Sequence, residues 1–198
     1  MSGLVLASAS ASRRRMLEAA GVAFLVEPAL VDEASVKETM RAQKAGAAQI
    51  AEALAELKAL KVSQKYPAAL VLGADQTLDF GGEVLDKPVS AEDARAQLRR
   101  LSEGTHALPT AAVIAEGGRA LWRKVSVPRV AFRKLSEAFI ARHVEAMGDR
   151  ALQCVGACEV EGTGAQMISR IEGDFYSALG LPLLEVLEYM RQRGFLAT

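Results

Sequence analysis

Charged residues of both signs stand at the positions where this sequence predicts strand ends, turns and one long helix. The cations are Arg13, Arg14, Lys58 and Lys87, and the anions are Glu33 and Asp75. Such a mixed site suits a lone anion poorly, because the carboxylates would repel it. It suits a polyphosphate with a divalent metal, since the metal takes carboxylate oxygens and the phosphates take arginine and lysine. The pattern predicts metal-assisted attack on a phosphate ester, which needs charge neutralisation, positioning and one base to orient water.

The remaining reactive residue types form no competing catalytic set. His106 follows a predicted helix and His143 lies on a helix that we expect to be solvated, so both are interpreted as structural. Cys154 and Cys158 are the only cysteines, and their spacing is neither Cys-x-x-Cys nor part of a four-ligand set. We interpret them as buried structural thiols.

Residues 4–17 predict a strand, a tight polar turn and a helix in succession. Ser8, Ser10 and Ser12 lie in or next to this turn and can cap its free backbone N–H groups. Three consecutive arginines, Arg13, Arg14 and Arg15, begin the helix, and their charges oppose the helix dipole unless a strongly anionic ligand binds there. The alternative is a capped helix with a basic, solvated first turn. Neither a Walker loop nor a Gly-x-Gly-x-x-Gly motif is present.

The other charged residues are placed by their neighbouring elements. The apolar run at residues 68–73 predicts a buried strand with Asp75 just past its carboxyl end, where open α/β sheets bind ligands. A hairpin over residues 78–85 returns Lys87 toward the same end, and Glu33 lies on a predicted loop. Each of these residues has an ordinary alternative. Asp75 can be a turn or cap residue, Lys87 an exposed turn residue, and Glu33 a loop carboxylate without a ligand.

The rest of the sequence predicts alternating strands and helices in a mixed sheet. One alanine-rich helix is expected from residue 36 to residue 62, and glycines near residues 154–171 indicate a loop and hairpin whose backbone approaches another segment closely. Further helices are expected at residues 91–101, 136–146 and 183–193, and further strands at residues 22–27, 110–115, 120–127 and 129–132.

Length and charge limit the classes of protein that the chain can represent. Its 198 residues fit one domain, 1–198, with two lobes at most. The 24 basic residues balance 24 acidic ones, so nothing predicts binding to a nucleic-acid polymer or an anionic membrane. We see no secretory leader and no apolar run near the roughly 20 residues that span a bilayer. We therefore expect a cytoplasmic protein.

Taken together, the motifs resemble the Maf family of nucleoside triphosphate pyrophosphatases, almost from end to end. The matching stretches are Leu-Ala-Ser-Ala-Ser at residues 6–10 followed by Arg13-Arg14, Val-Asp-Glu at 31–33, Leu-Gly-Ala-Asp at 72–75, Leu-Asp-Lys-Pro at 85–88, residues 94–102 with Thr105-His106, Glu-Gly-x-Gly at 161–164, and Gly173-Asp174 through Gly-Leu-Pro-Leu at 180–183. The resemblance implies an elongated mixed β-sheet flanked by helices, with a cleft between two lobes, similar to inosine triphosphatases.

The resemblance also implies an activity and its residues. Family members hydrolyse non-canonical or modified nucleoside triphosphates to the monophosphate and pyrophosphate with a divalent cation, Mg or Mn. Asp75 matches the general base, and Glu33 with Asp75 matches the metal site. The residues expected to bind the triphosphate are Ser8, Ser10, Arg13, Arg14, Lys58 and Lys87. A homodimer is implied as well, and the family is associated with arrest of septum formation.

Three positions bear on the choice of nucleotide. Members that prefer dTTP and UTP have Thr, Gln and Arg where this chain has Gln76, Glu161 and Ser12. Gln76 and Glu161, together with Cys154, resemble the branch that acts on 7-methyl-GTP. A physical reason is that a carboxylate at position 161 can accept hydrogen bonds from guanine N1–H and N2–H₂ and favours a cationic ring. Ser12 fits neither branch, Ala11 replaces the usual proline, and residues 102–105 read Ser-Glu-Gly-Thr in place of Ser-Gly-x-Thr.

Three other functions stay open at this point. One is a dTTP/UTP-type pyrophosphatase of the same family, and another is a phosphatase that releases orthophosphate. The third is a nucleotide-binding regulator of septum formation without turnover. A carboxylate at position 75 favours an enzyme, since a protein that only binds triphosphate has little use for an unpaired base there.

Overall fold

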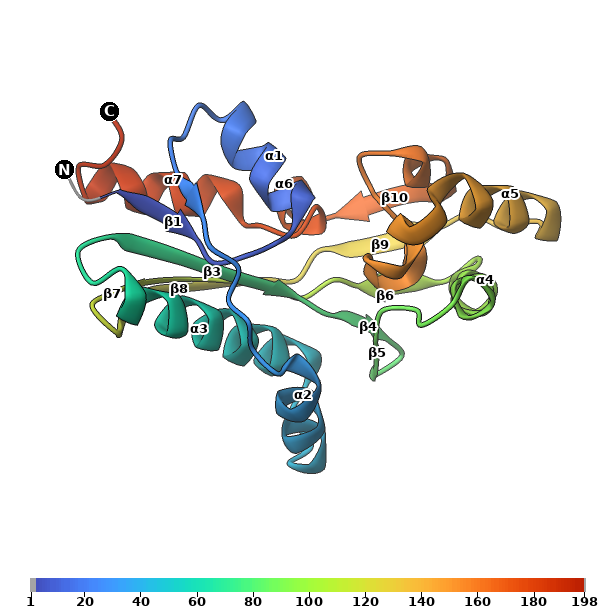
Figure 1. The fold of residues 1–198 in the computed structure, drawn as a ribbon. Helices are drawn as coiled ribbons and strands as arrows, with labels where there is room; N and C mark the ends of the chain where they lie inside the picture. The colour runs from blue at the N-terminus through green and yellow to red at the C-terminus, as the bar shows by residue number, and fades with distance from the viewer. Residues whose placement is uncertain (1–2, 198) are drawn as a thin grey trace.

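The computed structural model describes residues 3–197 as an elongated α/β molecule with two five-stranded sheets joined end to end (Figure 1). The first sheet has the order β2-β1-β3-β7-β8, and its strands are Leu25–Val26, Leu4–Leu6, Leu70–Gln76, Thr110–Glu116 and Arg119–Ser126. Strand β1 pairs in parallel with β2 and β3, whereas β3–β7 and β7–β8 are antiparallel. The predicted mixed sheet is thus confirmed.

The second sheet is antiparallel throughout and has the order β10-β9-β6-β4-β5. Its strands are Ile168–Glu172, Arg129–Phe132, Thr105–Ala107, Leu78–Phe80 and Glu83–Leu85. The chain passes directly from β3 to β4, from β6 to β7 and from β8 to β9, so three long ribbons run through both sheets. Hydrogen bonds from Thr77 N to Pro109 O (3.0 Å) and from Leu108 N to Pro128 O (2.9 Å) cross the junction and hold the two sheets together.

Helices cover both faces of the first sheet. Helices α1 (Ala11–Ala19) and α7 (Leu183–Gln192) lie on one face, and α3 (Ala47–Lys65) lies on the other (Figure 1). Alternate residues of β3 face opposite layers, as the period of a strand requires. Leu72 joins the core with α1 and α7, while Val71 packs toward Val62 of α3.

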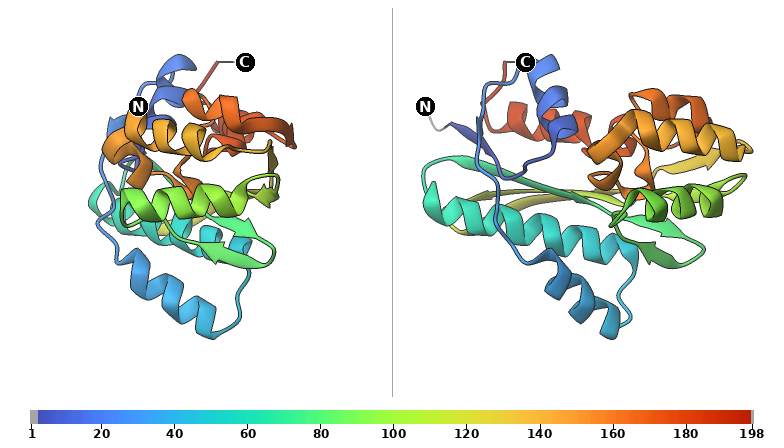
Figure 2. Two further views of the ribbon diagram at one scale, coloured as in Figure 1. Left: turned by 90° about the vertical axis from the view of Figure 1, so that its right-hand side faces the viewer. Right: turned by 45° about the vertical axis from the view of Figure 1, so that its right-hand side comes forward.

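The second sheet is covered by helices α4 (Ala91–Leu101) and α5 (Glu137–Met147), with α6 (Phe175–Ala178) near the junction. Figure 2 shows these two long helices together at one end of the molecule, away from both termini. Helix α4 has the predicted bounds and the predicted cap, since the Ser90 hydroxyl accepts from Asp93 N. Within residues 3–197 no helix combines the length and the apolar character needed to cross a bilayer.

The single helix expected over residues 36–62 is wrong. The chain instead forms α2 (Glu33–Ala42) and α3, which are separated by a turn in which Lys44 has φ 58°. Gly46 begins α3, and its N–H donates to Gln49 Oε1. Helix α2 buries no residue, so no packing holds it in line with α3, and it projects from the body of the molecule (Figures 1 and 2).

The hairpin expected within residues 154–171 is also wrong. Short 3₁₀ turns at Val155–Ala157 and Thr163–Met167 lead into β10, which pairs with β9. The expected close approach is confirmed: a Cβ on Gly156 would lie 2.8 Å from Leu78 Cδ1 and 3.2 Å from Leu101 Cδ1. Strand β6 and the short helix α6 were not predicted. The strand expected at residues 22–27 is shorter than predicted, because only Leu25–Val26 form β2.

Candidate active site

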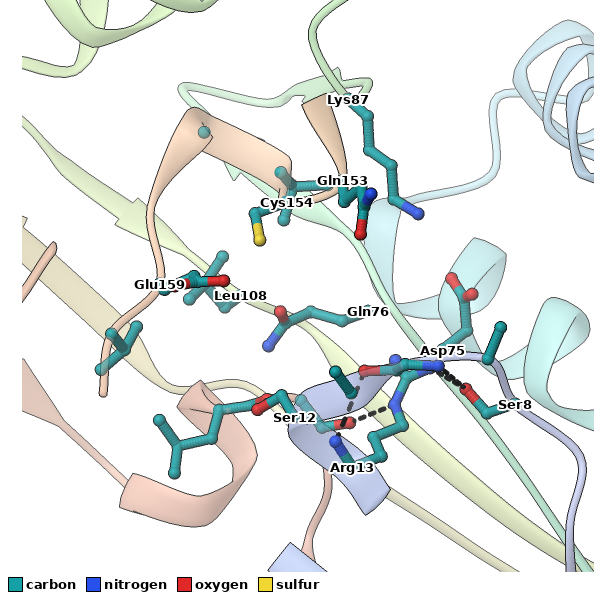
Figure 3. A pocket seen from close by; sticks show the side chains of 18 of the residues that line it. Ser8, Ser12, Arg13, Asp75, Gln76, Lys87, Leu108, Gln153, Cys154 and Glu159 are labelled. Atoms are coloured by element: carbon teal, nitrogen blue, oxygen red, sulfur yellow. Dashed lines mark hydrogen bonds between the residues drawn. The ribbon is translucent and has the colours of Figure 1, made fainter. Parts of the chain in front are cut away.

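A cavity of about 580 Å³ lies at the junction of the two sheets (Figure 3). We call its first part the charged end, defined by Ser8, Arg13, Glu33, Lys58 and Asp75. The second part, the apolar end, is lined by Leu108, Val130, Phe132, Cys154 and Val155. Figure 3 shows Ser8, Arg13 and Asp75 close together, with Leu108 and Cys154 at some distance from them.

At the charged end, one lysine joins two carboxylates. The Lys58 ammonium lies 2.6 Å from Asp75 Oδ1 and 2.7 Å from Glu33 Oε1. Lys58 and Asp75 are 7% and 6% exposed, so their attraction is weakly screened. Within residues 3–197 no group donates a hydrogen bond to the second oxygen of Asp75. That oxygen is available to accept a proton from a bound water.

A glycine makes this pairing possible. Gly73 lies two residues before Asp75 on the same face of β3, and a Cβ there would lie 2.2 Å from Ala55 O and 2.6 Å from Ala59 N. Because no side chain separates them, the backbones of β3 and α3 approach closely. Lys58, on the same helix as these alanines, is thereby brought within hydrogen-bond distance of Asp75.

Glu33 reaches the cavity from a helix terminus and not from the predicted loop. It is the first residue of α2, and Asp32 caps that helix by accepting from Ser35 N at 3.0 Å. Glu33 and Lys87 line the same cavity. Burial, the largest single effect, would raise the pKa of Glu33, but the hydrogen bond and charge of Lys58 together with the charges of Lys87 and Lys37 hold the pKa below its ordinary value. Glu33 is therefore ionised at neutral pH.

The turn between β1 and α1 supplies the other cation of the charged end. Arg13 Nε donates to Gly180 O at 2.8 Å, and its Nη1 donates to Ser8 Oγ at 3.1 Å. Ser10 caps α1 by accepting from Arg13 N, as predicted. Burial lowers the pKa of the Arg13 guanidinium, and the charges of Asp75 and Glu33 oppose that effect. The N-terminus of α1 and a buried guanidinium thus face the same space, which favours an anion.

Two lysines lie at the rim between the two ends. Lys87 lines the cavity and forms no salt bridge with any residue in the described range 3–197. Lys37 also lines it, and its ammonium lies 2.9 Å from Asp86 Oδ1. Because Arg41 pairs with the same carboxylate at 2.8 Å, Asp86 ties α2 to the loop that carries Lys87.

Gln76 lies next to Asp75 but points to the opposite face of β3. Its Nε2 donates to Thr110 Oγ1, to Ser177 O and to Ala178 O, at 2.9, 2.9 and 3.3 Å. These bonds occupy the amide nitrogen and leave the amide oxygen toward the cavity, 3.9 Å from where a Cβ of Gly180 would lie. Gln76 therefore offers a ligand an acceptor.

Glu161 closes the other side of the cavity. Its Oε1 accepts from Ser12 Oγ at 2.7 Å and from Arg15 Nη2 at 2.9 Å. Burial opposes ionisation, but the backbone N–H of Glu161, the Ser12 hydroxyl and the Arg15 guanidinium lower the pKa of the carboxyl. Glu161 thus gives the cavity that Gln76 also lines a second acceptor, one that carries a negative charge.

The histidines and cysteines do not form a catalytic set. His106 lies edge-on to Phe132 in the cavity wall, and burial lowers its pKa to about 4, so its ring is neutral. His143 is buried, and its Nε2 lies 3.0 Å from Ala157 O, so the solvated position expected for it is wrong. Burial raises the pKa of Cys154 to about 11 and that of Cys158 to about 12, so both thiols stay protonated.

The structure gathers all but one of the residues expected from sequence around this cavity. Those lining it are Ser8, Ser10, Ser12, Arg13, Glu33, Lys58, Asp75, Gln76, Lys87 and Glu161. Arg14 is the exception, because its exposed guanidinium pairs with Glu18 at 3.6 Å on the outer side of α1. Sequence reasoning missed Arg15 and Lys37, although each is one helical turn from an expected site residue on its own helix, Ser12 and Glu33 respectively.

The donor set fits a magnesium-like ion that shares its ligands with a substrate. Among residues 3–197 no three His, Cys, Asp or Glu side chains group into a complete metal site. Glu33 and Asp75 each keep an oxygen that does not face Lys58. Magnesium is commonly held by one or two carboxylates together with substrate phosphates and water, so two carboxylates beside an anion-binding turn are a suitable set.

The fold and the cavity define an α/β protein whose cleft suits a ligand with an anionic part and a less polar part. A family model described as "Maf-like protein" matches residues 3–193. Similar relatives are the "Nucleoside triphosphate pyrophosphatase" of Hyphomonas neptunium, 49% identical over 98% of each chain, and that of Paramagnetospirillum magneticum, 44% identical over 96% of this chain and 98% of the relative. The "7-methyl-GTP pyrophosphatase" of Brucella abortus is 43% identical over 96% of this chain and 95% of its own length. This chain belongs to the Maf family, which confirms the resemblance found in the sequence.

Proposed function

We propose that this Maf-type nucleoside triphosphate pyrophosphatase acts on modified nucleotides, with 7-methyl-GTP as the best substrate. The products are the nucleoside monophosphate and pyrophosphate. The observation that carries the proposal is the buried Lys58 between Asp75 and Glu33, beside the Arg13 turn and at one end of a cavity whose other end is apolar. A triphosphate fits the first end, and a nucleobase fits the second.

In this proposal the triphosphate is bound by the lysine and arginine side chains of the cavity and by the turn that begins α1. Arg13 and Lys58 are buried and fixed by their own hydrogen bonds, while Lys87 is exposed at the rim and can follow the distal phosphates. Ser8 and Ser10 shape the turn whose N–H groups face the anion. Glu33 and Asp75 would hold the divalent cation, which when bound supplies charge neutralisation at the phosphates.

Asp75 is proposed as the general base. Its free oxygen accepts a proton from a water, and the oxygen of that water attacks the α-phosphorus. The bond from the α-phosphorus to the bridging oxygen breaks, and pyrophosphate leaves with the electron pair of that bond. Lys58 on the other Asp75 oxygen fixes the direction of the carboxylate, so the accepting oxygen is preorganised.

The nucleobase is proposed to be read by two acceptors. Gln76 has its amide nitrogen occupied, and Glu161 carries a negative charge. Guanine presents donors at N1–H and N2–H₂, and methylation at N7 makes the ring cationic, which a carboxylate favours. The Brucella relative with 7-methyl-GTP in its name is as similar overall as several with the general name, so these two residues, and not overall identity, support the choice.

The deciding experiment is a panel of nucleoside triphosphates with product identification. We expect magnesium-dependent release of pyrophosphate, fastest with 7-methyl-GTP at limiting substrate, and slower with GTP, dTTP and UTP. In Glu161→Gln the ratio of kcat/KM between 7-methyl-GTP and UTP should fall, with UTP as the internal reference. Binding without turnover would favour the regulator, orthophosphate would favour a phosphatase, and a preference for dTTP and UTP would favour the other branch.

The remaining expectations belong to the same proposal. A single domain is supported by the three ribbons that run through both sheets. A cytoplasmic location is supported by two free cysteines, which reducing compartments preserve. The homodimer and any part in septum formation stay predictions, and light scattering of the purified protein tests the first of them.

A further inference from the structure

The contact between Glu161 and α1 is asymmetric at the level of single atoms. Ser12 Oγ and Arg15 Nη2 both donate to Oε1 of the carboxylate. Within residues 3–197 no other residue donates to Oε2, and the one further donor to the carboxyl is the backbone N–H of Glu161 itself. One oxygen is thus held from α1, and the other is left for a ligand in the cavity that Glu161 lines.

Arg15 is separated by the helix from the phosphate-binding arginine. Arg13 is buried and tied to Gly180 O, and Arg14 pairs with Glu18 on the outer side of the helix. Consecutive residues of a helix point about 100° apart, so the three guanidiniums face three directions. Arg15 alone of the three pairs with Glu161, while its side chain stays about half exposed.

Glu161 lies in a segment that has little regular structure of its own. It stands between the 3₁₀ turns at Val155–Ala157 and Thr163–Met167, and it is 146 residues away from Arg15 in sequence. Side chains on such a segment gain direction mainly from tertiary contacts. Ser12 also donates to Leu179 O, so its hydroxyl is shared between two acceptors. The ionic contact from Arg15 is the stronger of the two ties.

We propose that Arg15 is a positioning residue for nucleobase selection: it holds one oxygen of Glu161 so that the other faces the base. This inference rests on the proposed function, in which Glu161 reads the base. Arg15 does not touch the phosphates in this arrangement. Its removal changes how well a donor-bearing base is bound and leaves the hydrolytic step as it is.

The test compares Arg15→Met with Arg14→Met, a matched loss of one arginine from the same helix turn. In Arg15→Met we expect KM for 7-methyl-GTP to rise about tenfold, the size of one weakened hydrogen bond to a charged group. The kcat for 7-methyl-GTP and both constants for UTP should stay within about twofold, and Arg14→Met should match the wild type for both nucleotides. Arg15→Lys should recover part of the lost affinity, since it retains the charge without the planar donor group.

A double variant separates positioning from other roles. In a Glu161→Gln background, Arg15→Met should produce no further change in the preference for 7-methyl-GTP over UTP. An equal loss of affinity for both nucleotides would overturn the inference, because it would indicate a phosphate contact. Unchanged constants in Arg15→Met would overturn it as well.

The same measurements distinguish the inference from the proposed function. If the wild type shows no preference for 7-methyl-GTP, the proposed substrate is wrong, whatever the result for the Arg15 variants. If the preference is present and Glu161→Gln abolishes it while Arg15→Met retains it, only the inference about Arg15 fails.

Discussion

The charged end of the cavity and the side that Glu161 closes are built in different ways. At the charged end, Asp75 comes from β3 and Lys58 from the helix α3 packed on it, and both are almost fully buried and pair at 2.6 Å. Glu161 instead comes from a segment of short turns and pairs with an arginine that is half exposed. Regular elements therefore fix the residues proposed for the chemistry, whereas Glu161, one of the two residues proposed for recognition, lies between short turns; the other, Gln76, lies on β3. Nucleobase preference can then change without disturbing the hydrolytic step.

The strongest test of this division is Asp75→Asn. We expect kcat to fall by about 10²–10⁴, the usual contribution of a general base, and by the same factor for every nucleotide. The fold should persist, because Glu33 still pairs with Lys58. Pyrophosphate release on 7-methyl-GTP and UTP, together with thermal unfolding, measures both effects. A variant that lost activity on one nucleotide only would contradict the division.

Gly73→Ala should disturb the Lys58–Asp75 pair at the charged end by pushing the backbones of β3 and α3 apart. The new Cβ would meet Ala55 O and Ala59 N of α3, neither of which is a flexible side chain. Separating β3 from α3 should lower the free energy of unfolding by about 1–3 kcal/mol or more and move Lys58 away from Asp75. Denaturant unfolding gives the first quantity, and kcat gives the second. As a control, Gly3→Ala adds the same methyl group where nothing lies within 4 Å, and it should have little effect on either.

Gln76→Ala addresses the proposed selection of the nucleobase. It removes the hydrogen bonds from Gln76 to Thr110 Oγ1, Ser177 O and Ala178 O, although Ser177 O still accepts from Gly180 N and Thr110 Oγ1. We therefore expect a loss of about 1 kcal/mol in the free energy of unfolding. The preference for 7-methyl-GTP should decrease, while kcat on UTP changes little. An equal loss of kcat on all nucleotides would show that Gln76 takes part in hydrolysis. That result would contradict the separation of residues for hydrolysis from residues for nucleobase selection.

The smallest expected effect is the pH dependence of the Glu33–Lys58 pair. The pKa of Glu33 is lowered in the folded protein, so this carboxylate stabilises the fold fully above its ordinary value of 4.5, and the contribution is lost as the pH falls through the folded-state pKa. Wild type should be more stable than Glu33→Gln at pH 7, and the difference should shrink below pH 4.5. Unfolding at pH 7 and at pH 3.5 checks the sign. A difference that grows in acid would contradict the assigned direction.

Several features were predictable because local sequence decides them. Ser90 followed by Glu92 and Asp93 specified the start of α4, and the apolar run before Asp75 specified a buried strand. The position of the carboxylate just past the end of that strand was wrong, because β3 continues through Asp75 to Gln76. The break between α2 and α3 was not predictable, because alanine-rich sequence favours a helix on either side of it. Only the absence of a core under α2 allows the chain to turn at Lys44.

The sequence by itself determined which residue types are present at the ends of its elements, and hence that cations and carboxylates would meet. The tertiary structure alone decided the pairings. Helix α3 places Lys58 next to Asp75 because Gly73 has no side chain to keep the two backbones apart. The orientation of α1 decides that Arg13 points inward, Arg14 outward and Arg15 toward Glu161. The physical reason is that propensity and capping act over a few residues, whereas the direction of a side chain depends on the packing of segments far apart in the chain.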